Sequence, residues 1–248
     1  MATYVIGDLH GNIKGFLQCL EQCEFDYQKD TLIQLGDVID GGEFVYECVE
    51  ELLKIKNLIA IKGNHEAWLL EFLKSSYHPV QWTYGALSTA KSYAIHSGKK
   101  LIFKYSGNGF KVSLNPEDIP QQHQIFFEKQ LLYYNDQNNN LFVHGGLNRF
   151  QPIKDQRPET FYWDRTLWQD ALQWQIQNRY QGTVEPFYIA DNYKNIFIGH
   201  TSTLNWGLNT PLKAAHIYNL DTGSGGKNGR LTIMDLHTKK FWQSDLIY

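Results

Sequence analysis

Three short motifs carry acidic, amide and imidazole side chains, and each follows an apolar run typical of a β-strand. The motifs read GDLHG (7–11), GDVIDGG (36–42) and GNHE (63–66), and the apolar runs are 4–6, 32–35 and 58–61. Asp37 follows Asp8 by 29 positions and Asn64 follows Asp37 by 27, which fits a strand, a crossover helix and the next strand. Because right-handed crossovers bring the ends of parallel strands to one sheet edge, we expect the motifs to converge there.

The residue types in these motifs favour a divalent metal site. Carboxylate and amide oxygens combined with imidazoles, without cysteine, suit Mn, Fe, Zn or Mg better than a thiolate-bound structural zinc. The candidate ligands are Asp8, His10, Asp37, Asn64, His144 and His200. One aspartate can bridge two ions with its two oxygens, and Asp37 in the central motif is the best placed to do so. Two such ions form a clamp for in-line displacement at phosphorus and lower the pKa of a bound water.

Two further motifs, HGG (144–146) and GHT (199–201), complete a set of five. With them the sequence resembles the calcineurin-like metallophosphoesterases, in the branch of the serine/threonine protein phosphatases, small bacterial and phage phosphatases and diadenosine tetraphosphatases. The motifs run in family order, so the resemblance extends over essentially the whole chain. It implies an α/β fold in which two mixed β-sheets form a sandwich flanked by helices. We expect one domain over 1–248, with insertions at about 66–135 and 150–193 forming a helical cap over the metal site.

The resemblance also implies a role for each motif residue. It assigns six side chains to two divalent ions: Asp8 and His10 to the first, Asp37 to both, and Asn64, His144 and His200 to the second. Mn is the favoured metal, with Fe, Zn or Mg as alternatives. His65 would protonate the leaving oxygen, and Asp40 would fix its tautomer. An imidazole oriented by a carboxylate is also a common way to hold a general acid near neutral pH.

The sequence offers one main arginine for the substrate phosphate. The family run is usually GDxxDRG, whereas Gly41 stands at the arginine position here. A second family arginine has its match in the run 163–165, so Arg165 is the predicted catalytic and substrate-binding arginine. Arg165 could instead form a surface pair with Asp164 in an amphipathic turn. Arg149, beside the HGG motif, is the alternative phosphate ligand.

Composition sets the outer limits of the prediction. The 248 residues, 42% of them hydrophobic, can bury a sizeable core as one domain. A net charge of −3 without a basic run indicates no nucleic-acid footprint, and no apolar stretch is long enough to span a membrane. The cysteines, Cys19, Cys23 and Cys48, are predicted to be buried free thiols. The first strand begins near residue 4, which leaves no room for a signal peptide, so we expect a cytoplasmic protein.

Apolar periodicity predicts the remaining elements. Helices are expected at 12–23, 44–56, 66–81, 87–96 and 116–134, and within 150–193. The segments 217–220 and 231–234 are predicted to be antiparallel strands around a glycine-rich turn. That turn, 223–230, lacks the Lys-Ser/Thr pair of a P-loop, so we do not interpret it as a phosphate loop.

Three functions remain open at this point. The first is a phosphomonoesterase acting on phosphoserine, phosphothreonine or a small phosphoester, and the second is a nucleotide polyphosphate hydrolase of the diadenosine tetraphosphate type. The third, a non-catalytic scaffold, is disfavoured because all six ligands, His65 and Asp40 are present. A cap rich in Trp and Tyr suggests that the phosphate carries an organic group, either a peptide or a base. The expected partner is therefore a phosphoprotein, a small phosphoester or a nucleotide.

Overall fold

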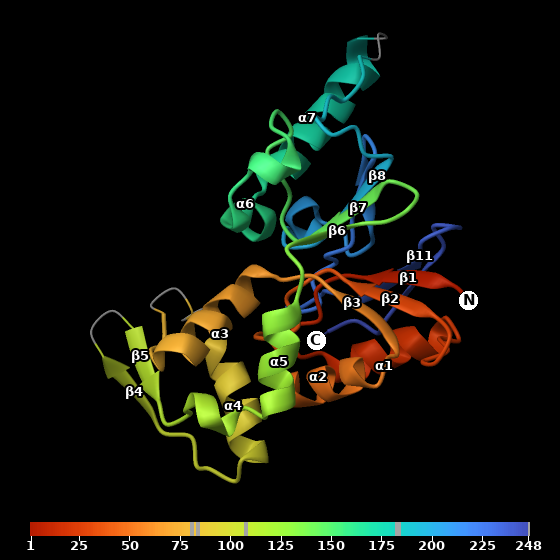
Figure 1. Cartoon of the computed structure of the whole chain (residues 1–248). Coiled ribbons are helices and arrows are strands. Elements are labelled where there is room, and N and C mark those ends of the chain that lie inside the picture. The colour runs from red at the N-terminus through yellow and green to blue at the C-terminus, as the bar shows by residue number, and fades with distance from the viewer. Residues whose placement is uncertain (80–81, 83–84, 107–108, 182–184, 248) are drawn as a thin grey trace.

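Two five-stranded sheets pack face to face, with helices on the outside (Figure 1). The computed structural model describes residues 1–79, 82, 85–106, 109–181 and 185–247. The strand order is β12-β11-β1-β2-β3 in the first sheet and β6-β7-β8-β10-β9 in the second. In the first sheet the parallel strands β1, β2 and β3 extend to one edge, and β11 and β12 continue the sheet antiparallel on the β1 side. In the second sheet the parallel strands β7, β8 and β10 are flanked on both sides by antiparallel strands. The predicted α/β sandwich of two mixed sheets is confirmed.

The strands are short and the helices lie between them in the sequence. The first sheet consists of β1 Thr3–Ile6, β2 Thr31–Gln34, β3 Asn57–Ala60, β11 Thr232–Asp235 and β12 Phe241–Gln243. The second consists of β6 Tyr133–Asn135, β7 Asn140–Val143, β8 Asn195–Ile198, β9 Leu212–Ala214 and β10 Ile217–Asn219. A separate hairpin pairs β4 Phe103–Ser106 with β5 Gly109–Val112. The α-helices are α1 Ile13–Gln22, α2 Val45–Leu53, α3 Asn64–Ser75, α4 Ala86–His96, α5 Gln121–Lys129, α6 Pro158–Trp163 and α7 Thr166–Gln181.

Apolar side chains are buried in three layers, which explains the nearly continuous apolar character of the central strands. Helices α1 and α2 cover the outer face of the first sheet, and α6 and α7 pack on the second (Figure 1). Along β1, Tyr4 and Ile6 join the core under the helices, while Val5 joins the core between the sheets. Both faces of such a strand are buried, as is usual for parallel strands.

The register of the first sheet brings the motif-bearing loops to one edge. In the parallel pairs, Ile6 lies opposite Gln34, and Gln34 lies opposite Ala60. The three strands therefore end level with one another, and the loops that carry Asp8 and Asp37 and the start of α3 follow directly. The convergence expected from the sequence spacing is confirmed.

The predicted helix over 116–134 is wrong in extent. The segment instead contains a 3-10 turn at Pro116–Asp118, then α5, and then strand β6. Pro120 has no N–H and disfavours a helical conformation in the residue before it, so the first turn cannot continue into α5. At the other end Tyr133 and Tyr134 pair with β7, because aromatic residues also suit a strand.

The two predicted tail strands exist, but they do not pair with each other. The segment 217–220 supplies β10, which lies between β8 and β9 in the second sheet. The segment 231–234 supplies β11, which lies between β1 and β12 in the first sheet. The chain between them therefore crosses from one sheet to the other, and it passes the edge that carries the motifs.

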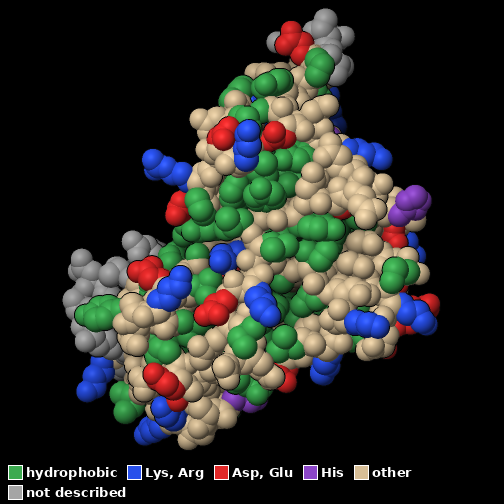
Figure 2. All heavy atoms as spheres, in the orientation of Figure 1, with side chains coloured by type: hydrophobic (Ala, Val, Ile, Leu, Met, Phe, Trp, Pro, Cys, Tyr) green, Lys and Arg blue, Asp and Glu red, His purple; other side chains and the backbone are tan. Residues whose placement is uncertain are grey.

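The expectation for the cysteines is confirmed. All three cysteines are buried free thiols, and burial raises the pKa of Cys19 and of Cys23 to about 12. Among the described helices, none is both long and apolar enough to cross a lipid bilayer. On the face drawn in Figure 2, Lys and Arg side chains are interspersed with Asp and Glu.

Candidate active site

Strand ends from both sheets bring the predicted site residues together. The first sheet supplies the ligands in the first three motifs, and the second supplies His144 after β7 and His200 after β8. Four site residues have a left-handed backbone, with φ values of 48° at His10, 54° at Asp37, 66° at Asp40 and 65° at His200. This conformation is uncommon outside glycine, although Asp and His tolerate it best. Such backbone strain often clusters at functional sites.

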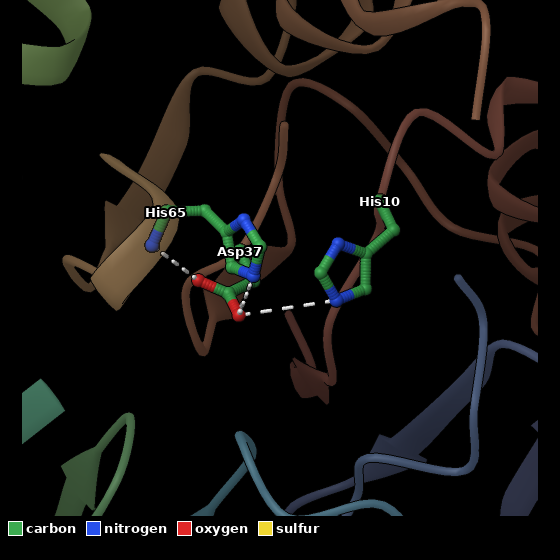
Figure 3. Close-up of side chains that lie close together, drawn as sticks. All are labelled: His10, Asp37 and His65. Atoms are coloured by element: carbon green, nitrogen blue, oxygen red, sulfur yellow. Dashed lines mark hydrogen bonds and ion pairs between the residues drawn. The ribbon is translucent and has the colours of Figure 1, made fainter. Parts of the chain in front are cut away.

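Asp37 faces three imidazoles. Its Oδ2 lies 3.8 Å from Nε2 of His10, 3.8 Å from Nε2 of His65 and 3.3 Å from Nε2 of His144. Figure 3 shows His10 and His65 pointing at this carboxylate from two sides. Burial opposes ionisation of Asp37, but His144, His65 and His10 outweigh it and hold the pKa well below its usual range. An ionised carboxylate in this central position can reach cations on either side.

His10 and His144 each direct Nδ1 at a backbone carbonyl and Nε2 toward the centre of the site. His10 Nδ1 lies 3.0 Å from the carbonyl oxygen of Ile39, and His144 Nδ1 lies 2.7 Å from that of Leu35. A histidine whose Nδ1–H donates to a carbonyl can present Nε2 to a metal, which is the usual arrangement in metal-binding histidines. His144 Nε2 then faces Asn64 Oδ1 at 3.1 Å.

His200 completes this group. Its Nε2 is buried and has no hydrogen-bond partner among the described residues. Burial, together with His144 and Arg165, lowers the pKa of His200, so its imidazole stays neutral. Asp37, His144 and His200 offer ligand atoms within 4.8 Å of one another. An unpartnered buried imidazole beside a carboxylate fits a bound cation.

Asp8 lies on the His10 side of the centre. Its Oδ2 is 4.0 Å from His10 Nε2, and its two oxygens accept the backbone N–H of His200 at 3.3 and 3.1 Å. The approach is so close that a Cβ at Gly199 would lie 2.1 Å from Asp8 Oδ1. The glycine of the GHT motif is therefore required sterically.

Buried negative charge accumulates around these ligands. Burial raises the pKa of Asp8, and the carboxylates of Asp221 and Asp37 raise it further. Burial and Asp37 likewise raise the pKa of Glu66 to about 7. Uncompensated buried carboxylates are unfavourable, so this donor set also fits divalent cations.

His65 is paired with Asp40 beside the ligands. Its Nδ1 lies 2.5 Å from Asp40 Oδ2, and its backbone N–H donates to Asp37 Oδ1 at 3.2 Å. Burial alone would lower the pKa of His65, but Asp37 and Asp40 outweigh it and raise the pKa to about 9. In metal-free protein at neutral pH, Nε2 is thus protonated, and it faces Asp37. Ligand atoms of His10, Asp37 and His65 also lie within 4.8 Å of one another. The hydrogen bond between His65 and Asp40 is the one expected if His65 acts as a general acid and not as a metal ligand.

Arg165 and Arg149 lie in different surroundings. Arg165 Nη1 donates to the carbonyl oxygen of His200 at 2.7 Å and to Thr201 Oγ1 at 2.8 Å, so its guanidinium lies beside the ligand loop. Arg149 donates to Asp170 Oδ2 at 2.8 Å and to the carbonyl oxygen of Tyr188 at 3.2 Å. Of these two arginines, Arg165 is therefore the one bonded to the loop of a candidate metal ligand.

Gly41 does not offer a ready place for the missing family arginine. Its φ is 79°, and a Cβ there would lie 3.2 Å from the Cβ of His10. A side chain at this position would therefore be strained, and it would press on a candidate metal ligand. Adding an arginine by a single substitution is expected to disturb the site.

Sequence reasoning did not assign a role to Glu66. Its carboxylate accepts the backbone N–H groups of Asp37, Val38 and Gly63 at 2.8, 2.7 and 2.9 Å, which ties the Asp37 loop to the start of α3. The signal was the acid at the third position of a helix, which is the glutamate half of a capping box; the N-cap residue, Gly63, has no side chain to supply the other half. Asp221 was also missed, because its contribution depends on the crossing of the tail between the sheets.

The pKa shifts predict how metal-free protein responds to pH. Groups with raised pKa values stabilise the folded state fully below their unfolded values and lose that contribution as pH rises through the folded values. Glu66 is raised from 4.5 to about 7 and His65 from 6.5 to about 9. The lowered pKa of His200 opposes this trend below about pH 6.5. We therefore expect the Tm of protein in EDTA to fall between about pH 6.5 and 9, by about 2–4 °C for each kcal/mol.

Divalent metal should reduce that fall, because cations would replace the protons that offset the buried carboxylates. Thermal unfolding in EDTA and in Mn²⁺ at pH 5, 7 and 9 measures both trends. Identical pH dependence with and without metal would contradict a cation site at these residues.

Comparison with known proteins places the chain in a family. Residues 1–209 match the model of the calcineurin-like phosphoesterases. Curated relatives include serine/threonine-protein phosphatase 1 of Salmonella typhimurium, 38% identical over 74 residues, which are 30% of this chain and 34% of that protein. They also include a symmetrical bis(5'-nucleosyl)-tetraphosphatase of Pseudomonas fluorescens, 28% identical over 149 residues, which are 59% and 43% of the two chains. The matches span less than half the length of either relative.

Solved structures show the same fold. One, provisionally described as a diadenosine tetraphosphatase, has a TM-score of 0.64 over 97% of this chain and 91% of that one, at 15% identity. A cold-active protein tyrosine phosphatase has a TM-score of 0.60 over 97% and 78%, at 14% identity. At these identities the likeness concerns the fold alone. The family-model match, which covers most of the chain and all five motifs, shows that this chain belongs to the calcineurin-like phosphoesterases.

Proposed function

We propose that this protein is a dinuclear metal-dependent phosphoesterase, foremost a phosphomonoesterase resembling the bacterial serine/threonine protein phosphatases. The observation that carries the proposal is the carboxylate of Asp37, which faces the imidazoles of His10, His65 and His144 within 3.8 Å. Family membership and the phosphatase names of the relatives support a hydrolase that acts on phosphoesters. A scaffold would not need this arrangement.

The ligand set would hold two divalent ions, with Mn²⁺ as the favoured metal and Fe, Zn or Mg as alternatives. Asp8 and His10 would hold one ion, Asn64, His144 and His200 the other, and Asp37 both. When bound, these ions would supply Lewis-acid stabilisation and an activated water for attack at phosphorus.

The protein side chains would then manage the leaving group and the phosphate. His65 Nε2 would donate a proton to the leaving oxygen, while Asp40 accepts Nδ1–H and keeps the ring in one tautomer. Arg165 has Nη1 bonded to the ligand loop and would bind phosphate oxygens with its remaining N–H groups.

An aromatic row beside the site supports an organic group on the substrate. Trp68 from α3 lies 5.0 Å from the His65 ring and 5.2 Å from Trp163 of α6, and Trp163 lies 5.8 Å from His200 (ring centroids). Trp163 is 41% exposed, so it can receive a ligand. We propose that the segments 66–135 and 150–193, which supply these rings, act as the cap of a single cytoplasmic domain.

A nucleotide polyphosphate hydrolase is the second candidate. A base could stack on Trp163, and several relatives carry the name bis(5'-nucleosyl)-tetraphosphatase. A phosphopeptide could use the same ring, so the aromatic row does not separate the two substrates.

A substrate panel tests the proposal. Purified protein loaded with Mn²⁺ would be assayed on p-nitrophenyl phosphate, a phosphoserine peptide and diadenosine tetraphosphate. We expect turnover of the phosphomonoesters to exceed that of the dinucleotide. Preference for diadenosine tetraphosphate would select the second candidate, and no turnover by metal-loaded protein would favour a scaffold.

Replacement of Arg165 tests phosphate binding. Loss of a preorganised donor to a transferring phosphoryl group typically costs about 10²–10³ in rate, so Arg165→Ala should lower kcat/KM by about that factor. Arg165→Lys should recover only part, because an ammonium cannot bind two oxygens as a planar fork. Arg149→Ala is the matched control, since that arginine pairs with Asp170 instead. Near-normal kinetics for Arg165→Ala would assign phosphate binding to another group.

A further inference from the structure

The carboxylate of Asp40 is bound on both oxygens by residues outside the five motifs. Thr89 Oγ1 donates to Asp40 Oδ1, and Trp82 Nε1 donates to Oδ2 at 2.9 Å. Oδ2 is the same oxygen that accepts His65 Nδ1. The side chains of Asp40, Trp82 and Thr89 are all buried.

Thr89 also holds the backbone of Asp40. Its hydroxyl accepts the N–H of Asp40 at 3.0 Å while donating to the carboxylate of the same residue. Asp40 needs this support, because its φ of 66° is an unfavourable conformation for a residue with a side chain. Thr89 lies in the first turn of α4, a helix that packs against α2 (Figure 1).

We propose that Trp82 and Thr89 are positioning residues, which fix the carboxylate of Asp40 and through it orient His65 toward the leaving group. The inference rests on the general-acid role proposed above. Without the two donors the Asp40 carboxylate could rotate, and the imidazole would sample orientations in which Nε2 no longer faces the substrate. This gives Trp82 and Thr89 a role in catalysis without contact with substrate.

The alternative is that Trp82 and Thr89 contribute only to core packing. Trp82 packs against Phe72 at 5.5 Å and His78 at 5.3 Å (ring centroids), so deleting the indole would also remove packing. Trp82→Phe retains an aromatic ring and removes the N–H donor. Thr89→Val retains the shape and removes the hydroxyl, and Thr89→Ser restores a hydroxyl.

Matched controls come from the same chain. Trp168 is buried, and its Nε1 has no hydrogen-bond partner in the described ranges, so Trp168→Phe changes a core indole without removing such a bond. Ser92, on the same helix as Thr89, accepts the backbone N–H of Tyr46 at 3.0 Å. Ser92→Ala therefore removes a buried hydrogen bond of α4 that does not touch Asp40.

The kinetic test compares phenyl phosphate, which has a poor leaving group, with p-nitrophenyl phosphate, which has a good one. Trp82→Phe and Thr89→Val should lower kcat for phenyl phosphate about tenfold, part of the roughly 10²–10⁴-fold that a general acid supplies. The loss should be smaller for p-nitrophenyl phosphate, with KM and metal content unchanged. Thr89→Ser should recover most of the activity, and the two controls should match the parent enzyme.

A spectroscopic measurement keeps the test independent of turnover. In metal-free protein, the NMR signal of the His65 Nδ1–H proton, identified by its loss in His65→Asn, should shift or broaden in Trp82→Phe and Thr89→Val but not in the controls.

The positioning role is overturned if Trp82→Phe and Thr89→Val match the controls in both measurements, or if they slow both substrates equally. The acid role itself fails if His65→Asn, assayed in parallel, shows no dependence on the leaving group. A leaving-group effect in His65→Asn without one in Trp82→Phe would reject positioning alone.

Discussion

Replacing Asp37 with asparagine is expected to release metal from both sides of the site at once. The asparagine amide carries no charge and keeps only one of the two oxygens. The imidazoles of His10 and His144 therefore lose the carboxylate that they both face. Metal ions contribute several kcal/mol of transition-state stabilisation, so kcat/KM should fall roughly 10³-fold or more. Metal analysis of the purified variant, alongside kinetics in excess Mn²⁺, measures both effects.

Asp30→Asn is the matched control for that variant. Asp30 is also buried, but its carboxylate accepts the backbone N–H groups of Ala2 and Asp26 at 2.7 and 3.1 Å, away from the candidate ligands. It should retain the metal content of the parent. If Asp37→Asn kept two ions and normal turnover, the bridging role would be wrong.

Replacing His65 with asparagine should impair chemistry and leave the metals in place. A general acid contributes roughly 10²–10⁴-fold, so kcat for a phosphoester with a poor leaving group should fall by about that amount. A good leaving group such as p-nitrophenolate needs little protonation, so kcat for p-nitrophenyl phosphate should fall less. Kinetics with several aryl phosphates, together with metal analysis of the same preparations, distinguish a loss of proton donation from a loss of metal.

His123→Asn controls for the loss of a buried histidine. His123 pairs with Glu50 and Tyr93 at 2.7 and 3.0 Å, so its replacement should act equally on all substrates. An equal loss for good and poor leaving groups in His65→Asn would count against the acid role. Loss of metal from that variant would instead indicate that His65 is a ligand.

The core of the candidate site could be predicted because its signals are local. The spacing of Asp8, Asp37 and Asn64 reflects successive β-α-β units, and each polar motif stands directly after an apolar strand. Since parallel strands end at a common edge, convergence follows from the topology. The register of β1, β2 and β3 bears this out.

Strand partners could not be predicted in the same way. The segments 217–220 and 231–234 both read as strands, yet they occupy different sheets. Alternation and β-propensity report that a segment fits a sheet, but they do not say which neighbour lies beside it. In 116–134 the apolar pattern predicted one helix on both sides of Pro120. Residues 133–134 instead form part of β6, because they pair with β7.

By itself the sequence determined the α/β class, the candidate metal ligands and the His65–Asp40 pair, because these depend on motifs of a few residues. Only the tertiary structure decided which buried groups surround them. Glu66 holds the Asp37 loop, and Trp82 and Thr89 reach Asp40 from 42 and 49 positions away. Such hydrogen bonds form because burial leaves each polar group to find a partner within the fold. That partner is set by which distant segments pack together, and no local pattern in the chain records it.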